Sequence, residues 1–156
     1  MFLVRRAVAA DSPAIYDVHV GAITRVCAEV YTAQEIAGWI ARKVPDGYVT
    51  AIGDNDFFVA TDGERVVGFS EFNPGAREVA AVYVHPDFLR RGTGAALLDA
   101  AEAAARGRRV SDVHLRATLN AVPFYLRGGY TIEREGTVEL GSGTLLRCVF
   151  MQKSLE

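Results

Sequence analysis

The stretch VYVHPDFLRRGTGAALLDAAEAAA, from Val82 to Ala105, joins a strand to a long helix through a short basic turn. The strand stops at a proline, and two arginines are followed by two glycines one residue apart. The first turn of a helix leaves backbone N–H groups unpaired, and the helix dipole adds roughly half a positive charge there. Glycines let phosphate oxygens approach the backbone, while Arg90 and Arg91 add full charges. The turn is therefore predicted to bind an anion.

The same turn also has a purely structural interpretation, since Gly92 and Gly94 would equally permit a tight turn or a close contact between helix and sheet. If it does bind an anion, the kind of anion follows by exclusion. The sequence has no GxxxxGK[ST] motif, whose lysine would reach a γ-phosphate, and the turn lacks the three glycines of GxGxxG. A pyrophosphate without a transferred γ-phosphate fits better, and coenzyme A carries one.

Around the turn, the spacing of apolar residues alternates between periods of two and about 3.6, which is typical of a mixed α/β domain. We expect one domain over residues 1–156. Asp62-Gly63, between two of the predicted strands, is a strong hairpin signal. Strands are predicted at residues 2–7, 57–61, 65–72, 77–84, 110–117, 130–135 and 144–152, and helices after residue 11, over 32–43, after the glycine turn and over 122–127.

Composition limits the classes of function. The 156 residues carry a formal net charge of −2, so no broad basic field is available for nucleic acid or an anionic membrane. Cys27 and Cys148 have neither a CxxC spacing nor a nearby set of histidines, so we predict buried free thiols and no metal site. The N-terminus lacks the apolar run of a signal peptide, and no window is long enough for a membrane span. We expect a cytoplasmic protein.

Two motifs, in the right order, resemble a known family. Residues 84–95, VHPDFLRRGTGA, resemble the Q/R-x-x-G-x-G/A turn of the GNAT superfamily of acetyl-CoA-dependent N-acetyltransferases, except that Leu89 stands where the family has glutamine or arginine. Residues 115–130, LRATLNAVPFYLRGGY, resemble the strand and F-Y segment of the same family. Residues 31–40, YTAQEIAGWI, are similar to a Y-S-x-E-x-x-x-W pattern in one branch of it.

The resemblance implies a GNAT-like α/β (α+β) fold, with a mixed, mostly antiparallel central sheet that is splayed in its middle and flanked by about four helices. It implies acetyl-CoA as cosubstrate, lying in the splayed gap, and no metal. The pantetheine arm would pair with the β-strand backbone before the turn, and the turn would hold the pyrophosphate. The implied cofactor-binding residues are Val82, Tyr83, Val84, Arg90, Arg91, Gly92, Thr93, Gly94, Ala95 and Asn120.

The reaction implied by the resemblance is direct attack of an amine on the thioester, with Tyr125 as the general acid that protonates the departing thiolate. A phenol has an ordinary pKa of about 10, so Tyr125 would hold its proton at neutral pH. The alternative for Tyr125 is a core residue with a satisfied hydroxyl. Asn120 is implied as a pantetheine ligand, although counting back from Tyr125 with the usual family spacing reaches Thr118 instead.

Glu71 is the predicted base. The period of two places it on the same side of its strand as Val67 and Phe69, facing inward or toward the cleft. A carboxylate held there would accept the proton of the amine, directly or through water. Glu78 and His114 are rival candidates, and each is also read as a structural or solvent-facing residue.

The sequence does not identify the acceptor. Tyr16, His19, Tyr31 and Trp39 would line its pocket or, as stripes at helical spacing, belong to the core. We favour a small-molecule amine over a protein N-terminus or lysine, and a homodimer is left open. An acyl-CoA-binding sensor or partner-binding module without turnover is the alternative function, and it would bind acetyl-CoA without releasing thiol. A structural protein would bind no ligand at all.

Overall fold

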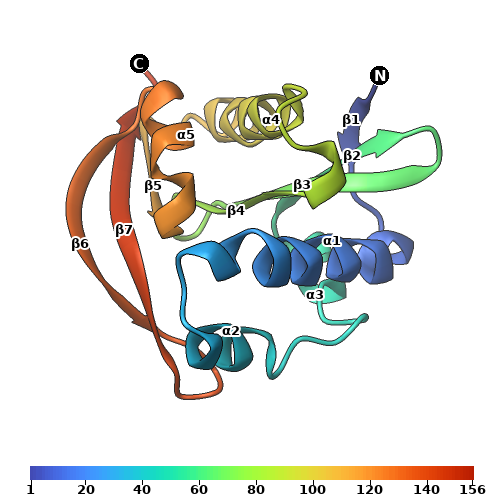
Figure 1. Ribbon diagram of the computed structural model, residues 1–156. Helices are drawn as coiled ribbons and strands as arrows, with labels where there is room; N and C mark the ends of the chain where they lie inside the picture. The colour runs from blue at the N-terminus through green and yellow to red at the C-terminus, as the bar shows by residue number, and fades with distance from the viewer.

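The computed structural model describes residues 1–156 and contains one seven-stranded sheet with helices on both faces (Figure 1). The sheet is mixed and mostly antiparallel, as predicted. The strands are β1 (Leu3–Arg6), β2 (Asp56–Asp62), β3 (Arg65–Asn73), β4 (Glu78–Val84), β5 (Asp112–Ala117), β6 (Thr131–Glu139) and β7 (Leu145–Ser154). The helices are α1 (Ser12–Arg25), α2 (Ala33–Ile40), α3 (Val49–Asp54), α4 (Thr93–Gly107) and α5 (Val122–Arg127).

Most predicted elements are present, and the departures have local causes. Helix α3 is not expected from the sequence, because none of its six residues is buried and no apolar stripe marks it. Helix α2 ends at Ile40, three residues earlier than predicted, and β6 continues four residues further than predicted, to Glu139. None of the five helices combines the length and hydropathy that crossing a bilayer requires.

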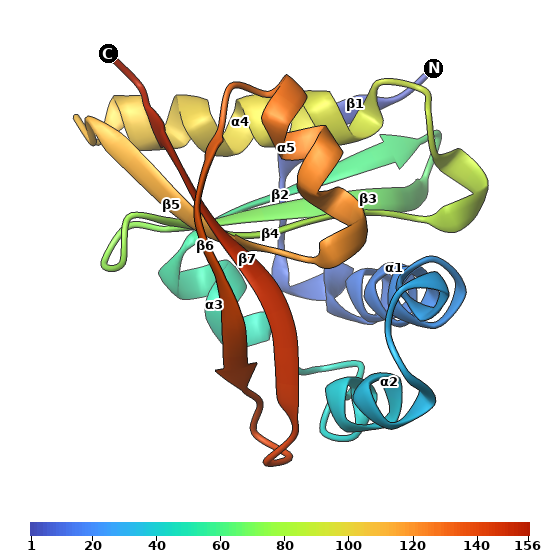
Figure 2. The same cartoon turned by 60° about the vertical axis from the view of Figure 1, so that its left-hand side comes forward.

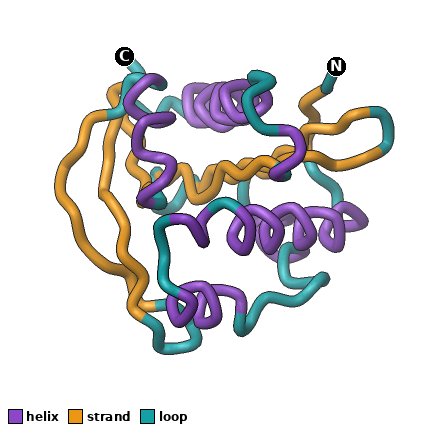
Figure 3. Tube along the Cα trace, viewed as in Figure 1, coloured by secondary structure: helices purple, strands orange, loops and turns teal.

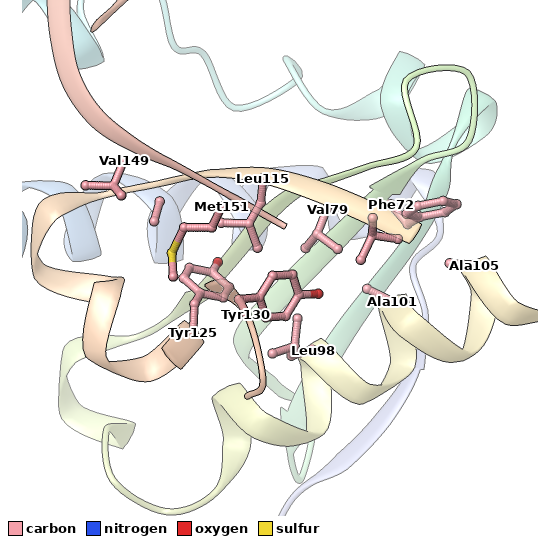
Figure 4. Close-up of a cluster of buried hydrophobic side chains, with 12 residues drawn as sticks. Phe72, Val79, Leu98, Ala101, Ala105, Leu115, Tyr125, Tyr130, Val149 and Met151 are labelled. Atoms are coloured by element: carbon pink, nitrogen blue, oxygen red, sulfur yellow. The ribbon is translucent and has the colours of Figure 1, made fainter. Parts of the chain in front are cut away.

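The helices divide into two layers. Helices α4 and α5 cover one face of the sheet, and α1, α2 and α3 cover the other (Figures 1 and 3). Under α4 and α5 lies a cluster of twelve buried residues that includes Leu98, Tyr125 and Tyr130 (Figure 4). On the opposite face, Val18 of α1 packs against Phe69 of β3. Each face therefore has its own core, and each large side chain contributes roughly 1.5–3 kcal/mol by leaving water.

The sheet is interrupted between β4 and β5. The strand order is β1-β2-β3-β4-β5-β7-β6, and only β4 and β5 are parallel neighbours. They share a single register pair, Glu78 with His114, beside the hydrogen bond from the His114 N–H to the Arg77 carbonyl (3.0 Å). Beyond that pair the strands separate, and β6 and β7 run steeply across the direction of β2 and β3 (Figure 2). We call this interruption the seam, and it is the predicted splay.

Helix α2 is attached to the hairpin formed by β6 and β7. It begins with a capping box in which Thr32 and Glu35 bond each other's backbone N–H groups, and Glu35 also forms an ion pair with Arg147 of β7 (2.8 Å). The Ser142 hydroxyl, at the hairpin tip, donates to the Gly38 carbonyl (2.7 Å). The helix and the hairpin tip accordingly lie side by side in Figures 1 and 2.

Candidate functional site

The turn between β4 and α4 presents six unpaired amides. The first helical hydrogen bond runs from the Ala96 N–H to the Gly92 carbonyl (3.1 Å), and none of the N–H groups from Arg90 to Ala95 donates within the chain. Arg90 (φ +64°) and Gly92 (φ +80°) both adopt left-handed backbone conformations, on either side of Arg91. Alternation of this kind turns successive N–H groups toward the same side. This arrangement, at a helix N-terminus, is suited to a pyrophosphate.

Positive charge surrounds these amides. Arg90 and Arg91 are exposed, and neither takes part in an ion pair within the chain. The Arg91 guanidinium lies over the Phe88 ring, 5.0 Å from its centroid, which holds it beside the turn. Leu89 is also exposed, so its departure from the family pattern removes a polar side chain and leaves the backbone donors in place.

The open edge of β4 borders the seam. On its other edge β4 pairs with β3, through Ser70 with Val82 and Gly68 with Val84. The His85 N–H also donates to β3, to the Val67 carbonyl (2.7 Å). Successive N–H groups of a strand point to opposite edges, so those of Val82 and Val84 point into the seam. An extended ligand beside β4 would find these groups free.

Asn120 lies across the seam from β4, in the 3-10 turn Leu119–Ala121 that follows β5. It is exposed, and its side chain lies beside the Cys27 thiol. Burial raises the pKa of Cys27 to about 12, so this thiol stays protonated. Both cysteines, Cys27 and Cys148, are buried and free.

Tyr125 lies beside Tyr130 in the buried cluster next to α4 (Figure 4). Its ring is edge-on to those of Phe124 and Tyr130, at centroid distances of 5.0 and 5.6 Å. The two neighbouring tyrosines differ in their hydroxyl groups. The Tyr130 hydroxyl donates to Glu102 (2.8 Å), whereas the Tyr125 hydroxyl has no hydrogen-bond partner within the chain. Burial raises the pKa of Tyr125, so its phenol holds a proton at neutral pH.

Glu71 lies on the face of the sheet covered by α1 and α3. Its carboxylate accepts a hydrogen bond from the Asn55 amide, which follows α3 (2.7 Å). Burial raises the pKa of Glu71, and the Asn55 donor partly opposes this effect. A half-buried carboxylate with a raised pKa takes up a proton more readily than an exposed one.

Val67 lies on the opposite face from Phe69, contrary to the prediction. The register between β2 and β3 shifts at a bulge between Ala60 and Thr61, so the alternation of side chains is broken at Val67. Val67 packs in the cluster that contains Leu97 of α4, whereas Phe69 packs with α1. The inward placement of Glu71 next to Phe69 is unaffected.

The rival bases both contact other side chains. Glu78 binds Arg116 through two hydrogen bonds of 2.8 and 3.1 Å. His114 lies between Asp112 (2.9 Å) and Glu133 (3.3 Å). Both residues stand where β4 and β5 still pair, away from the open part of the seam. Their side chains are committed to other groups, which favours Glu71 among the three.

His19, one of the predicted pocket residues, lies between α1 and the sheet beside Tyr48, which sequence reasoning missed. His19 Nδ1 is 2.7 Å from the Tyr48 hydroxyl, and the His19 ring packs on Tyr83 (centroids 4.4 Å apart). Burial, with a contribution from the charge of Lys43, lowers the pKa of His19 well below its ordinary value. His19 Nε2 is buried and has no partner. Tyr48 follows a turn and belongs to no periodic pattern, so the sequence gives no signal for it.

The other predicted pocket residues are Tyr16, Tyr31 and Trp39. The Tyr31 hydroxyl donates to the Arg147 carbonyl (2.7 Å) and accepts the Leu119 N–H (3.0 Å), so Tyr31 ties the N-terminal helices to β7 and the turn after β5. Trp39 is buried edge-on to Tyr31 (5.3 Å), and Tyr16 is half-buried on α1. The fold therefore brings the glycine turn, the β4 edge, Asn120 and Tyr125 around the seam. It leaves Tyr31 in a structural role, and Trp39 lines a pocket between α2 and the tip of the β6–β7 hairpin.

Comparisons with known proteins agree with this geometry. A family model for the acetyltransferase (GNAT) domain matches residues 27–154, which confirms the resemblance. A GCN5-related N-acetyltransferase from Rhodopseudomonas palustris is 27% identical, with a TM-score of 0.91 over 98% of this chain and 95% of its own. The PaiA N-acetyltransferase from Thermoplasma acidophilum, in complex with coenzyme A, is 20% identical, with a TM-score of 0.80 over 99% of both chains. The yncA protein from Salmonella typhimurium, with its cofactor acetyl-CoA, is 26% identical, with a TM-score of 0.67 over 99% and 94%. No curated protein matches the chain significantly in sequence.

Proposed function

The chain belongs to the GNAT acetyltransferase family, and from that premise we propose that it transfers the acetyl group of acetyl-CoA to a primary amine by direct attack in a ternary complex. The observation that carries the proposal is the run of six unpaired amides from Arg90 to Ala95. Any helix start leaves four such donors free, here those of Gly92 to Ala95, and Arg90 and Arg91 extend the run and add two unpaired charges beside it. We favour a small molecule over a protein as the acceptor.

Acetyl-CoA is the acetyl donor of GNAT enzymes, and the residues of this chain fit it. The amides of the turn, with Arg90 and Arg91, would bind the pyrophosphate. Val82 and Val84 would hydrogen-bond the pantetheine along the open edge of β4, and Asn120 would contact it from the β5 side. When bound, the cofactor supplies an activated thioester at the seam.

Tyr125 would donate the proton that the departing thiolate needs. Its hydroxyl has no other partner to satisfy, and burial keeps it protonated. A positioned general acid of this kind contributes roughly 10²- to 10⁴-fold to the rate.

Glu71 would accept the proton of the attacking amine. It lies on the opposite face of the sheet from Tyr125. Its Asn55 partner fixes the carboxylate, and its raised pKa matches it better to an amine than an exposed glutamate would be. Tyr125 and Glu71 come from different layers of the fold, α5 and β3, so acid and base would act from the two sides of the seam.

Two measurements test the proposal and separate it from an acyl-CoA sensor. Calorimetric titration of acetyl-CoA should show one site, and a panel of primary amines should release free thiol in the presence of the protein. Binding without thiol release from any amine would favour the sensor, and absence of binding would favour a structural protein.

A further inference from the structure

A pocket of about 270 Å³ lies between α2, the loop that follows it and the tip of the β6–β7 hairpin. Arg42, Lys43, Tyr48 and Ser142 are among its lining residues, and no acidic side chain lines it. The chain as a whole is slightly acidic, with a net charge of −2. The two cations are therefore a local feature and do not come from a basic surface.

Both cations lack a partner. Neither Arg42 nor Lys43 makes an ion pair or a side-chain hydrogen bond within the chain, although Lys43 is half-buried. Glu35 binds Arg147, and Asp46 does not line the pocket. A partly desolvated cation without a counter-ion is unfavourable, and an anion in the pocket would remove that cost.

Three aromatic rings, those of Tyr48, His19 and Tyr83, form a chain of contacts from the pocket to the predicted transfer site. Tyr48 forms one wall, and its ring lies 5.9 Å from that of His19. His19 in turn packs on Tyr83, at 4.4 Å, in the segment of β4 that borders the seam. The phosphate-binding turn begins α4, on the other face of the sheet (Figures 1 and 2). The pocket is thus on the acceptor side, and its cations are not those that serve the cofactor.

We propose that this pocket selects the acceptor, and that the acceptor is a small primary amine carrying an anionic group, a carboxylate or a phosphonate-like oxyanion. The inference rests on the proposed acetyltransferase function. Arg42 would bind the oxyanion through its planar fork, and Lys43 would add a point charge from the half-buried side. Tyr48 is fixed by His19 and shapes the wall between the anion and the amine.

The test compares matched amines. Glycine, β-alanine and γ-aminobutyrate are each paired with their carboxamides, and the corresponding aminoalkylphosphonates form a third series. Thiol release is measured for each, and kcat/KM is expressed per neutral amine, because a carboxamide lowers the pKa of a nearby amino group. The best anionic amine should exceed its carboxamide by about 10- to 100-fold, the range of a charge-assisted hydrogen bond. Comparison of the acids with the phosphonates identifies the oxyanion.

Variants locate the effect. Arg42→Gln and Lys43→Gln should each lower kcat/KM for the anionic amine about tenfold, chiefly through KM, and leave the carboxamide unchanged. Arg109→Gln is the matched control, because Arg109 is exposed, unpaired and follows α4 on the other face. Equal rates for acids and carboxamides, or equal losses in all three variants, would overturn the inference while leaving the acetyltransferase intact.

A binding measurement keeps the inference testable if turnover fails. N-acetyl-β-alanine and its carboxamide are titrated calorimetrically into the protein with saturating coenzyme A. Tighter binding of the acid, lost in Lys43→Gln, would support the anion pocket even if no amine released thiol. Equal affinities, or no binding of either compound, would reject it.

Discussion

Gly92 and Gly94 stand one residue apart in the turn and meet different requirements. Gly92 adopts φ +80°, and a Cβ built there would find no protein atom within 4 Å. Gly94 has an ordinary φ, but a Cβ there would come within 3.2 Å of the Phe124 ring. The first position faces the space that a pyrophosphate would occupy, and the second allows α4 to pack against α5. The structural interpretation therefore applies to Gly94, whereas the open space at Gly92 fits the proposed ligand-binding role.

Replacing Gly92 by aspartate should abolish acetyl-CoA binding. The side chain would enter open space, and its charge would oppose the pyrophosphate, so we expect the Kd from calorimetry to rise at least 100-fold. Aspartate tolerates a left-handed backbone better than most residues, which limits the loss of stability. Gly63→Asp is the matched control, because Gly63 also has φ +61° and open space but lies in the β2–β3 hairpin. Unchanged affinity in Gly92→Asp would show that this turn does not bind the cofactor.

Tyr125→Phe should lower kcat by about two orders of magnitude with little change in acetyl-CoA affinity, because it removes the proton donor and keeps the packing. Tyr130→Phe is the internal comparison, since it leaves Glu102 without one donor in the same core. That variant should lose about 1–3 kcal/mol of unfolding free energy and keep its kcat. Wild-type turnover in Tyr125→Phe would show that Tyr125 is only a core residue and that water protonates the thiolate.

Glu71→Gln should flatten the acidic limb of the pH profile of kcat/KM. If Glu71 is the base, wild-type activity should fall at low pH as its carboxylate is protonated, and the raised pKa should move that limb toward neutral pH. Glutamine keeps the hydrogen bond from Asn55 but accepts no proton, so the limb set by the carboxylate should disappear and the remaining rate should rise only as the amine loses its own proton. Glu78→Gln and His114→Gln serve as controls over the same range. Loss of the limb in either control, with Glu71→Gln unaffected, would transfer the role to that residue.

The stability of the same variant provides an independent check. A carboxyl group whose pKa is raised on folding stabilises the native state at low pH, and that contribution is lost as the pH rises through the folded-state pKa. Glu71→Gln should therefore have a higher unfolding free energy than the wild type at neutral pH, with the difference disappearing in acid. Denaturant unfolding at several pH values measures this difference, and a less stable variant at neutral pH would contradict the assignment of a desolvated carboxylate.

At the scale of elements, the junction between α2 and the β6–β7 hairpin rests on Gly38. A Cβ at Gly38 would overlap the Thr144 side chain. Gly38→Ala should therefore cost about 1–3 kcal/mol of unfolding free energy, as overpacking does. Gly53→Ala in α3 is the control, because a Cβ there meets nothing within 4 Å, and it should stabilise by about 0.4–1 kcal/mol. Chemical unfolding of both variants measures the two free energies. Similar values would show that the junction between α2 and the hairpin rearranges to accept the extra methyl group at no cost.

The sequence predicted those elements whose signals are local. The β2–β3 hairpin follows from Asp62-Gly63, and the turn before α4 follows from its glycines and arginines, because each is one continuous stretch. The bulge at Val67 could not be predicted, since it depends on the register between β2 and β3. The proposed anion pocket could not be predicted from the sequence either. Lys43 and Ser142 come together only because α2 packs on a hairpin formed near the end of the chain.

At the scale of the whole molecule, the two half-sheets correspond to two continuous segments of chain. Strands β1–β4 come before α4, and β5–β7 follow it. Bound cofactor should join them, and hydrogen exchange measures this. With saturating coenzyme A, the amides of Val82 and Val84 should exchange at least tenfold more slowly, while that of Tyr83, which points to β3, changes little. Equal effects on all three amides would argue for general stabilisation without pairing at the seam.

The seam also has a consequence for how the protein is made. During synthesis β1–β4 are complete before any residue of β5 leaves the ribosome, so the open edge of β4 is then an exposed edge strand. Natural sheets commonly protect such edges with charged residues or proline, but the segment Val82-Tyr83-Val84 has neither. The unpaired backbone groups that would let this edge bind a cofactor would equally let it pair with a strand of another nascent chain. Aggregation before the C-terminal half-sheet folds is therefore a hazard built into the same feature that prepares the site.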